Sequence, residues 1–201
     1  ETSMYSLTRN DARVINFFIR NFKERNSINE LGRKLKLSPR GIYKILKKLE
    51  KINALKSEKI GNAIYYKINL DEEIGIKLAE FVLVQNEFNN AYAKVYAEDL
   101  RKLKDVALGC ILYGSVLKVG KKARDIDTLI IIEKKDYKRA SNKLADIRQM
   151  ATKSIHDVMM TKEDLANNLN KGNEAMMDML RYGQVLWGAD IIVEAIKNGL
   201  S

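Results

Sequence analysis

The 201-residue sequence contains one cysteine and one histidine. A single cysteine, Cys110, excludes a disulfide within the chain. One cysteine and one histidine are also too few side chains for a structural zinc site, which takes four such ligands. Cys110 lies in the apolar run VALGCILY. We therefore expect it to be a small buried hydrophobe rather than a reactive thiol.

Long apolar runs are also missing. No run approaches the roughly 20 residues that a transmembrane helix needs. The sequence does not open with the basic, apolar and small-residue pattern of a secretion signal. No internal repeat or low-complexity tract is present. These absences predict a globular protein without a membrane partner, in a reducing, cytoplasmic location.

Positive charge is abundant but unevenly placed within the net charge of +10. Residues 1–70 carry 16 Lys and Arg against 6 Asp and Glu, whereas residues 71–201 carry 20 of each. A surface that is basic only for solubility would spread its charge along the whole chain. The segregated charge favours a polyanion as partner of the first part.

Three helices are predicted in residues 1–51. The first has apolar residues at helical spacing (Val14, Phe17, Phe18 and Phe22), with Asn10 or Asp11 as its cap. The second opens with the capping-box pattern of Ser27 and Glu30. The third opens with Ser38 as N-cap and the single proline, Pro39, at the first helical position, where a missing N–H costs least.

After the third helix the period changes. The segment ALKSEKIGNAIYYKINL predicts two short strands about a turn at Gly61–Asn62. The order of elements over residues 5 to 70 resembles the winged helix-turn-helix family. That resemblance implies double-stranded DNA as partner, with the helix from Ser38 to Lys51 in the major groove and the hairpin at Lys59 to Ala63 as the wing. The expected DNA-contacting residues are Ser38, Arg40, Tyr43, Lys44, Lys47, Lys48 and Lys59.

Residues 71–104 carry an apolar stripe at three- and four-residue steps: Ile74, Leu78, Phe81, Phe88, Tyr92 and Val95. The spacing predicts one long helix, or two helices with a break near Asn89–Asn90. The stripe is either an ordinary core face or the seam of a homodimer.

From Asp105 onward, predicted strands and helices alternate, which indicates α and β layers. The fold class is therefore α/β (α+β), with a small mixed sheet flanked by helices. The expected parts are a winged-helix domain over residues 1–70, a connecting or dimerisation helix over 71–104, and a second domain over 105–201.

The segment YGSVLKVGKKARDIDTLIII carries the candidate chemistry. Gly114 and Ser115 end a strand where free backbone N–H groups suit a phosphate. Asp125 and Asp127 are two apart on a strand, so their side chains share one face, and their repulsion predicts a bound Mg²⁺. Asp157, in the next strand, is expected to join them and hold a second metal. Basic residues of the intervening loop, Lys118, Lys121, Lys122 and Arg124, are expected to neutralise a triphosphate. By the same alternation, His156 is expected on the opposite strand face.

Gly-Ser, then Asp-x-Asp about ten residues later and a further strand Asp, resembles the DNA polymerase β-type nucleotidyltransferase superfamily. The size and the ending GQVLWGAD are similar to its minimal branch, over residues 95 to 198. The resemblance implies a nucleoside triphosphate substrate, Mg²⁺ and release of pyrophosphate. It also implies that Asp157 helps to activate the acceptor hydroxyl. The segment VLKVG departs from the family's usual Arg-Gly stretch, and Arg124 stands where the family usually has Ser.

Two functions remain open. The first is an enzyme that transfers a nucleotidyl group, with AMP from ATP favoured, to a hydroxyl of a protein, nucleic acid or small molecule. Many members of the minimal branch are antitoxins that modify a HEPN-type toxin. The second is a transcription regulator whose nucleotidyltransferase domain only senses nucleotide. A polymerase of the CCA-adding type is disfavoured, because the sequence lacks the extra helical domains with which such enzymes grip RNA.

Overall fold

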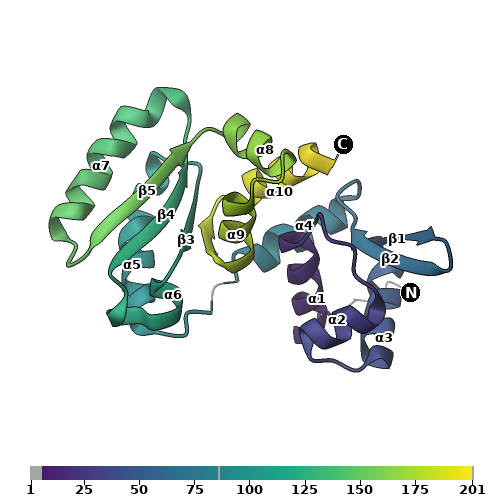
Figure 1. Cartoon of the computed structure of the whole chain (residues 1–201). Coiled ribbons are helices and arrows are strands. Elements are labelled where there is room, and N and C mark those ends of the chain that lie inside the picture. Colours follow the sequence, from purple (N-terminus) through teal and green to yellow (C-terminus); the bar gives the residue numbers. More distant parts are fainter. Residues whose placement is uncertain (1–5, 86, 201) are drawn as a thin grey trace. The chain divides into compact units, whose positions relative to one another are not determined.

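A computed structural model describes residues 6–85 and 87–200 (Figure 1). The fold is α+β, with helices around two small sheets. The chain divides into two compact units, one ending at Val82 and the other beginning at Leu83. The expected separate connector over residues 71–104 is thus shared between the two units.

The first unit contains three helices, a hairpin and a further helix. Their bounds are α1 Arg9–Arg20, α2 Ile28–Leu35, α3 Pro39–Lys51, β1 Leu55–Ile60, β2 Ala63–Ile68 and α4 Glu73–Leu83. Up to β2, the element order is the one that the sequence predicted. The apolar faces of α1, α2 and α3 meet in a core of fully buried side chains that includes Ile15, Ile19, Leu31, Ile42, Leu46 and Leu49. Burial of these faces fixes how the three helices pack.

Helix caps set the beginnings of α1 and α2. Ser27 and Glu30 form the predicted capping box. The predicted cap of α1 was wrong by two or three residues. Thr8 is the N-cap, and Asp11 occupies the third helical position, from which its carboxylate accepts the Thr8 backbone N–H. Asp11 belongs to a reciprocal capping box, which the sequence TRND already contained.

The hairpin of β1 and β2 is antiparallel and turns at Gly61–Asn62, as predicted. Its last pair is Ile60 with Ala63. Gly61 has φ +59°, which glycine adopts at little cost. The hairpin begins deep in the unit, where Leu55 is buried, and ends in an exposed tip.

The apolar stripe of residues 71–104 does not lie on one helix. Helix α4 ends at Leu83 and α5 spans Ala91–Arg101, with Asn90 as its N-cap, so the two-helix prediction holds. Phe81 and Val95, 50% and 58% exposed, belong to different helices and different units. Phe88 packs against the core of the second unit. The expected dimer seam, continuous along one helix, is therefore wrong.

The second unit is built around a four-stranded sheet. Its strands are β3 Gly109–Tyr113, β4 Asp125–Ile131, β5 Ser154–Met160 and β6 Gln184–Trp187. The remaining elements are η1 Lys102–Asp105, α6 Val116–Val119, η2 Gly120–Lys122, η3 Lys134–Asp136, α7 Tyr137–Met150, α8 Lys162–Asn170, α9 Glu174–Tyr182 and α10 Ala189–Leu200.

The sheet order is β5-β4-β3-β6. Figure 1 labels β5, β4 and β3 in this order. Strands β4 and β5 are parallel and joined through α7, whereas β3 is antiparallel to both β4 and β6. One face packs on α5 and α7, where Leu100 and Leu144 meet Ile126 and Ile130. The other face contacts α9 and α10. The sheet is mixed and flanked by helices, as expected.

Cys110 lies in the core of this unit, fully buried. Its sulfur lies 3.2 Å from the Thr128 hydroxyl, and burial raises the pKa of the thiol to about 12. A thiol with this pKa stays protonated at neutral pH and is a poor nucleophile. Cys110 is therefore the inert core residue that the sequence predicted.

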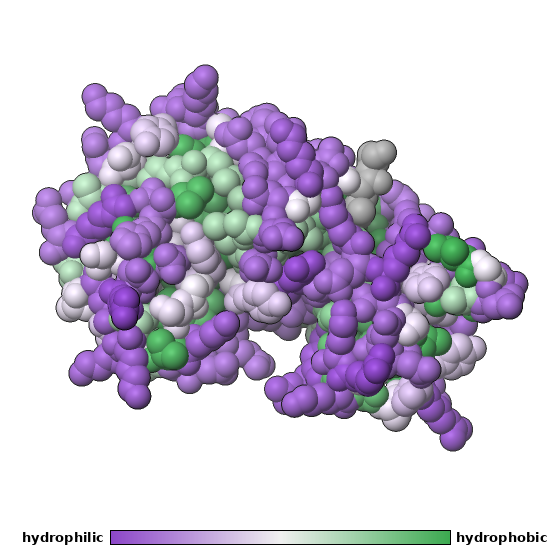
Figure 2. Space-filling model, in the orientation of Figure 1, coloured by the Kyte–Doolittle hydropathy of each residue, from purple (hydrophilic) through white to green (hydrophobic). Residues whose placement is uncertain are grey.

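Polar and charged side chains cover most of the surface seen in Figure 2, with smaller apolar areas between them. Within residues 6–85 and 87–200, no helix combines the length and apolar character needed to cross a membrane.

Candidate functional site

Two carboxylates lie side by side at the start of β4. Asp125 and Asp127 are half-buried, while Ile126 between them is fully buried on the other face. Asp127 pairs in register with Tyr113, the last residue of β3. The two carboxylates therefore lie where β3 ends and β4 begins, as the motif predicted.

Electrostatics make this pair unfavourable by itself. Burial raises the pKa of Asp127, and the neighbouring charge of Asp125 raises it further, while His156 acts in the opposite direction. A nearby cation stabilises two carboxylates that repel each other in a partly buried position. The site thus has the electrostatic character of a cation-binding position.

The expected third carboxylate does not join the pair. In the parallel register of β4 and β5, Asp127 lies beside His156, and buried Thr128 lies beside Asp157. Residues in register on parallel strands point to the same side of a sheet. Asp157 therefore points to the face covered by α7, where its carboxylate accepts from the guanidinium of Arg148. The prediction that Asp157 faces Asp125 and Asp127 was wrong.

His156 takes the position that was expected for Asp157. Among the described residues, Asp125, Asp127 and His156 form a possible metal-binding group, whose donor atoms all lie within 4.8 Å of one another. The Nδ1 atom of His156 lies 3.5 Å from an Asp125 carboxylate oxygen. The sequence held a sign of this arrangement. Ile155 is buried, so residues of its parity face the core, and His156 faces the carboxylates.

Gly114 fits its position because Asp127 leaves no room for a side chain. Its φ is +82°, and a Cβ atom placed on it would lie 2.1 Å from the Asp127 carboxylate oxygen. The exposed turn of Gly114 and Ser115 thus lies directly against the carboxylate pair. Ser115 precedes the four-residue α6, and its hydroxyl makes no capping hydrogen bond.

The two predicted phosphate-binding lysines are exposed. Lys118 lies in α6 and Lys121 in η2. The Lys118 ammonium lies 5.8 Å from the centre of the Tyr182 ring. Tyr182 is 65% exposed at the end of α9, two residues before Gln184 pairs with Leu112 of β3. The sequence analysis missed Tyr182, because only the β3–β6 pairing brings it near the site.

In the first unit, six of the seven expected DNA-contacting residues share one property. They are exposed and lie on α3, at its N-terminus or on β1 near the hairpin tip: Ser38, Arg40, Tyr43, Lys44, Lys47 and Lys59. Arg40 and Lys44 form no hydrogen bond or ion pair with any other described residue. Their charges are thus free to meet an anion.

Lys47 and Lys48 are instead engaged within the unit. Lys47 donates to the Glu50 carboxylate over 2.8 Å and lies 6.0 Å from the centre of the Tyr66 ring. Lys48 donates to Asp11 over 2.6 Å. Asp11 is 1% exposed, so Lys48 neutralises a buried charge and ties α3 to α1. These contacts indicate a structural role for Lys48 rather than the expected phosphate contact.

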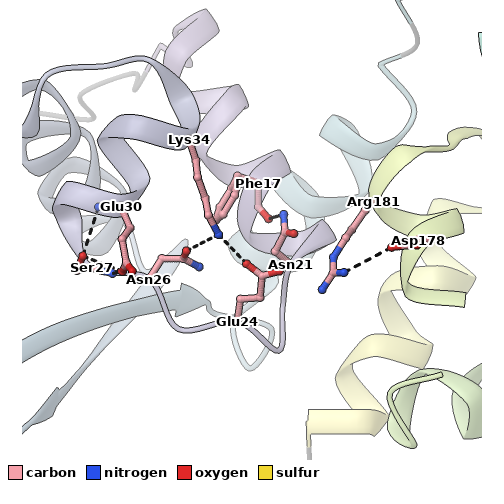
Figure 3. Close-up of polar contacts among 9 residues, drawn as sticks. All are labelled: Phe17, Asn21, Glu24, Asn26, Ser27, Glu30, Lys34, Asp178 and Arg181. Atoms are coloured by element: carbon pink, nitrogen blue, oxygen red, sulfur yellow. Dashed lines mark hydrogen bonds and ion pairs between the residues drawn. The ribbon is translucent and has the colours of Figure 1, made fainter. Parts of the chain in front are cut away.

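Lys34 fixes the position of α2 in a similar way (Figure 3). Its ammonium donates to Glu24 over 2.9 Å and to Asn26 over 2.7 Å, and lies 5.4 Å from the centre of the Phe17 ring. These contacts join α2 to the end of α1 and to the intervening loop. They position α2, on which α3 packs.

Comparison with known proteins gives little guidance on function. No family model matches the chain, and no curated protein matches it. Among solved structures, the chain is similar to a single-residue mutant of ZitR from Lactococcus lactis, at 19% identity and a TM-score of 0.30. That match covers 52% of this chain and 77% of the ZitR chain.

Proposed function

We propose that the second unit is a nucleotidyltransferase-fold domain that binds a nucleoside triphosphate with a divalent cation and transfers its nucleotidyl group. The observation that supports this proposal is the close approach of the Gly114 backbone to Asp127, because the turn that we propose to bind phosphate then lies against two paired carboxylates. The pair and the turn come from strands that the sheet holds rigidly together.

Each residue of the site has a proposed role. Asp125 and Asp127 hold the cation, and their carboxylate oxygens fit Mg²⁺. The Gly114–Ser115 turn donates backbone N–H groups to a phosphate. Lys118 and Lys121 balance the negative charge of the triphosphate.

The reaction is an in-line displacement at phosphorus. The acceptor hydroxyl oxygen forms a bond to the α-phosphorus, and the bond from that phosphorus to the bridging oxygen breaks. Pyrophosphate leaves with the electron pair of the broken bond, and the acceptor proton passes to water. A cation held by Asp125 and Asp127 would stabilise the charge that develops on the leaving oxygens. Asp157 is given no part in acceptor activation, because it points to the other face of the sheet.

A partner protein of the HEPN toxin type is the acceptor that we propose first, with ATP as donor. The test incubates the full chain, Mg²⁺ and the product of the neighbouring gene with ATP labelled either at the α- or at the γ-phosphate. Transfer of the α label alone supports nucleotidyl transfer. Transfer of the γ label identifies a kinase instead, and transfer of neither label to protein, nucleic acid or small molecules contradicts the enzyme proposal.

For the first unit we propose a winged helix that binds double-stranded DNA, on the strength of the unpaired charges of Arg40 and Lys44 on the exposed face of α3. Gel-shift titration of the full chain on mixed duplex fragments, at several salt concentrations, tests it. Affinity should fall linearly with the logarithm of salt concentration, because phosphate contacts release counterions. No shift at low salt would contradict the proposal.

A regulator that senses nucleotide without transferring it is the second candidate, because the chain joins a basic unit to the proposed nucleotide site. The two candidates differ in one measurement. Tight ATP binding by calorimetry, together with ATP-dependent DNA affinity and no transfer of label, favours the sensor.

A further inference from the structure

We propose that His156 is the third ligand of the metal site on β4 and β5, and that the site consequently prefers Mn²⁺ to Mg²⁺. This inference rests on the proposed function, because the cation is the one that nucleotidyl transfer would use. It differs from the all-carboxylate site that the sequence predicted.

The backbone register is the first support. Strands β4 and β5 pair continuously from Asp125 with Ser154 to Ile131 with Met160, which leaves no freedom to exchange His156 for Asp157. A slip of one residue would turn Ile155 out of the core, where it is 3% exposed. The apolar residues of β5 therefore hold the imidazole on the carboxylate side.

The donor atoms are the second support. The Asp125, Asp127 and His156 donors lie within 4.8 Å of one another, close enough for one ion to contact all three after small side-chain rotations. Asp157 instead pairs with Arg148 of α7, on the other face of the sheet. Among the described residues, no other acidic, cysteine or histidine side chain belongs to this group.

The chemistry of the donors decides the metal. Mg²⁺ takes oxygen ligands in octahedral geometry and keeps several waters. Imidazole suits transition ions such as Zn²⁺ and Ni²⁺, whereas Mn²⁺ shares with Mg²⁺ a preference for carboxylate oxygen. As a transition ion, Mn²⁺ still binds imidazole more readily than Mg²⁺ does. Mn²⁺ accepts both carboxylate oxygen and imidazole nitrogen. In a site with two carboxylates and one imidazole, His156 thus adds to the affinity for Mn²⁺ and adds little to the affinity for Mg²⁺.

The sequence offers an unusually direct test, because His156 is the only histidine of the chain. The full chain, prepared without a histidine tag and without nucleotide, is loaded with substoichiometric Mn²⁺. Electron spin echo modulation of the bound Mn²⁺ should show coupling to an imidazole ¹⁴N nucleus. The coupling should vanish in His156→Ala and in a sample labelled with ¹⁵N-histidine.

Binding by calorimetry gives the second readout. Mn²⁺ should bind about tenfold or more tightly than Mg²⁺, a free-energy difference of about 1.4 kcal/mol. His156→Asp restores a third carboxylate and should reduce this preference, whereas Asp127→Asn should weaken the binding of both ions.

Two results would overturn the inference. One is Mn²⁺ binding that Asp127→Asn weakens but that shows no ¹⁴N coupling, which would make His156 only an ion-pair partner of Asp125. The other is equal affinity for Mg²⁺ and Mn²⁺ in the wild-type chain. Neither result contradicts the proposed function. That function is tested separately, and it is contradicted if no α label is transferred with either ion.

Discussion

The two units of this chain use charge in opposite ways. The first unit carries 17 Lys and Arg against 10 Asp and Glu, whereas the second carries 19 against 16 and places two carboxylates against each other. In the first unit, the proposed DNA binding depends on which charges stay free at the surface: Arg40 and Lys44 do, and Lys48 does not. In the second unit, the proposed metal site depends on which side chains the sheet brings together. The comparison teaches that the sequence alone predicts where positive charge gathers, whereas predicting which side chains of a site converge also needs the strand register.

The largest effect that we expect distinguishes two of the three aspartates that the sequence assigned to the site, Asp127 and Asp157. Asp127→Asn should lower nucleotidyl transfer at least about a hundredfold, on the order of 3 kcal/mol in the barrier, because a metal-binding charge is lost. Asp157→Asn should cost less than about threefold, because Asp157 pairs with Arg148 on the other face. Single-turnover rates measured with α-labelled ATP compare them. Equal losses in both variants would contradict the register described here.

Among the ion pairs, the one between Lys48 and buried Asp11 should contribute most to the stability of the protein. Asp11→Asn leaves the Lys48 ammonium without its carboxylate and should lower the free energy of unfolding by about 2 kcal/mol. The matched control is Asp99→Asn, which breaks the surface pair with Lys102 and should change it by less than about 1 kcal/mol. Urea denaturation followed by circular dichroism measures both at pH 7.

The same pair gives a pH dependence with a fixed sign. Burial acts to raise the pKa of Asp11, but hydrogen bonds from Lys48 and Thr8 outweigh it, so the pKa lies below its usual value of 3.8. Its stabilisation is present above that value and is lost as the pH falls through the lower, folded-state pKa. The difference between wild type and Asp11→Asn should therefore shrink in strong acid. A difference that grows on acidification would exclude this linkage.

DNA binding should respond to the free charges alone. Arg40→Ala with Lys44→Ala should weaken duplex binding about tenfold at low salt and reduce the salt slope by about two, since each phosphate contact contributes about one. Lys134→Ala with Lys135→Ala removes two exposed charges from the second unit and serves as control. Gel shifts at several salt concentrations measure both. Equal weakening by the control pair would point to net charge rather than to α3.

The smallest effect compares two glycines with positive φ, one in each unit. Gly114→Ala adds a Cβ atom that displaces the Asp127 carboxylate, and should weaken Mn²⁺ binding severalfold, with a backbone strain of about 1 kcal/mol. Gly61→Ala introduces the same strain at the hairpin tip, where nothing lies within 4 Å of the added atom. It should leave Mn²⁺ affinity unchanged. Calorimetry on both variants separates the steric effect on Asp127 from the backbone strain that the two substitutions share.

Local patterns carried most of the fold. Ser27 with Glu30 and the Ser38–Pro39 pair marked helix starts, and Gly61–Asn62 marked the turn of the hairpin. These features depend on contacts between residues at most four apart, which the local sequence pattern predicts directly. The apolar stripe from Phe81 to Val95 was a less reliable guide, because its helical spacing continues across the break between α4 and α5. Asn90 is the N-cap of α5.

The sequence by itself determined the segregated charge, the α+β class, the starts of α2 and α3, the turn of the hairpin, and the placement of Asp125 and Asp127 on one face of a strand. Only the tertiary structure decided that His156, and not Asp157, lies beside them, and that Lys48 neutralises Asp11 while Arg40 stays free. The physical reason is the range of the interactions. Caps, turns and alternation act between near neighbours, whereas the register of β4 on β5 follows from burial of Ile155 under α7, and the partner of Lys48 lies 37 residues away.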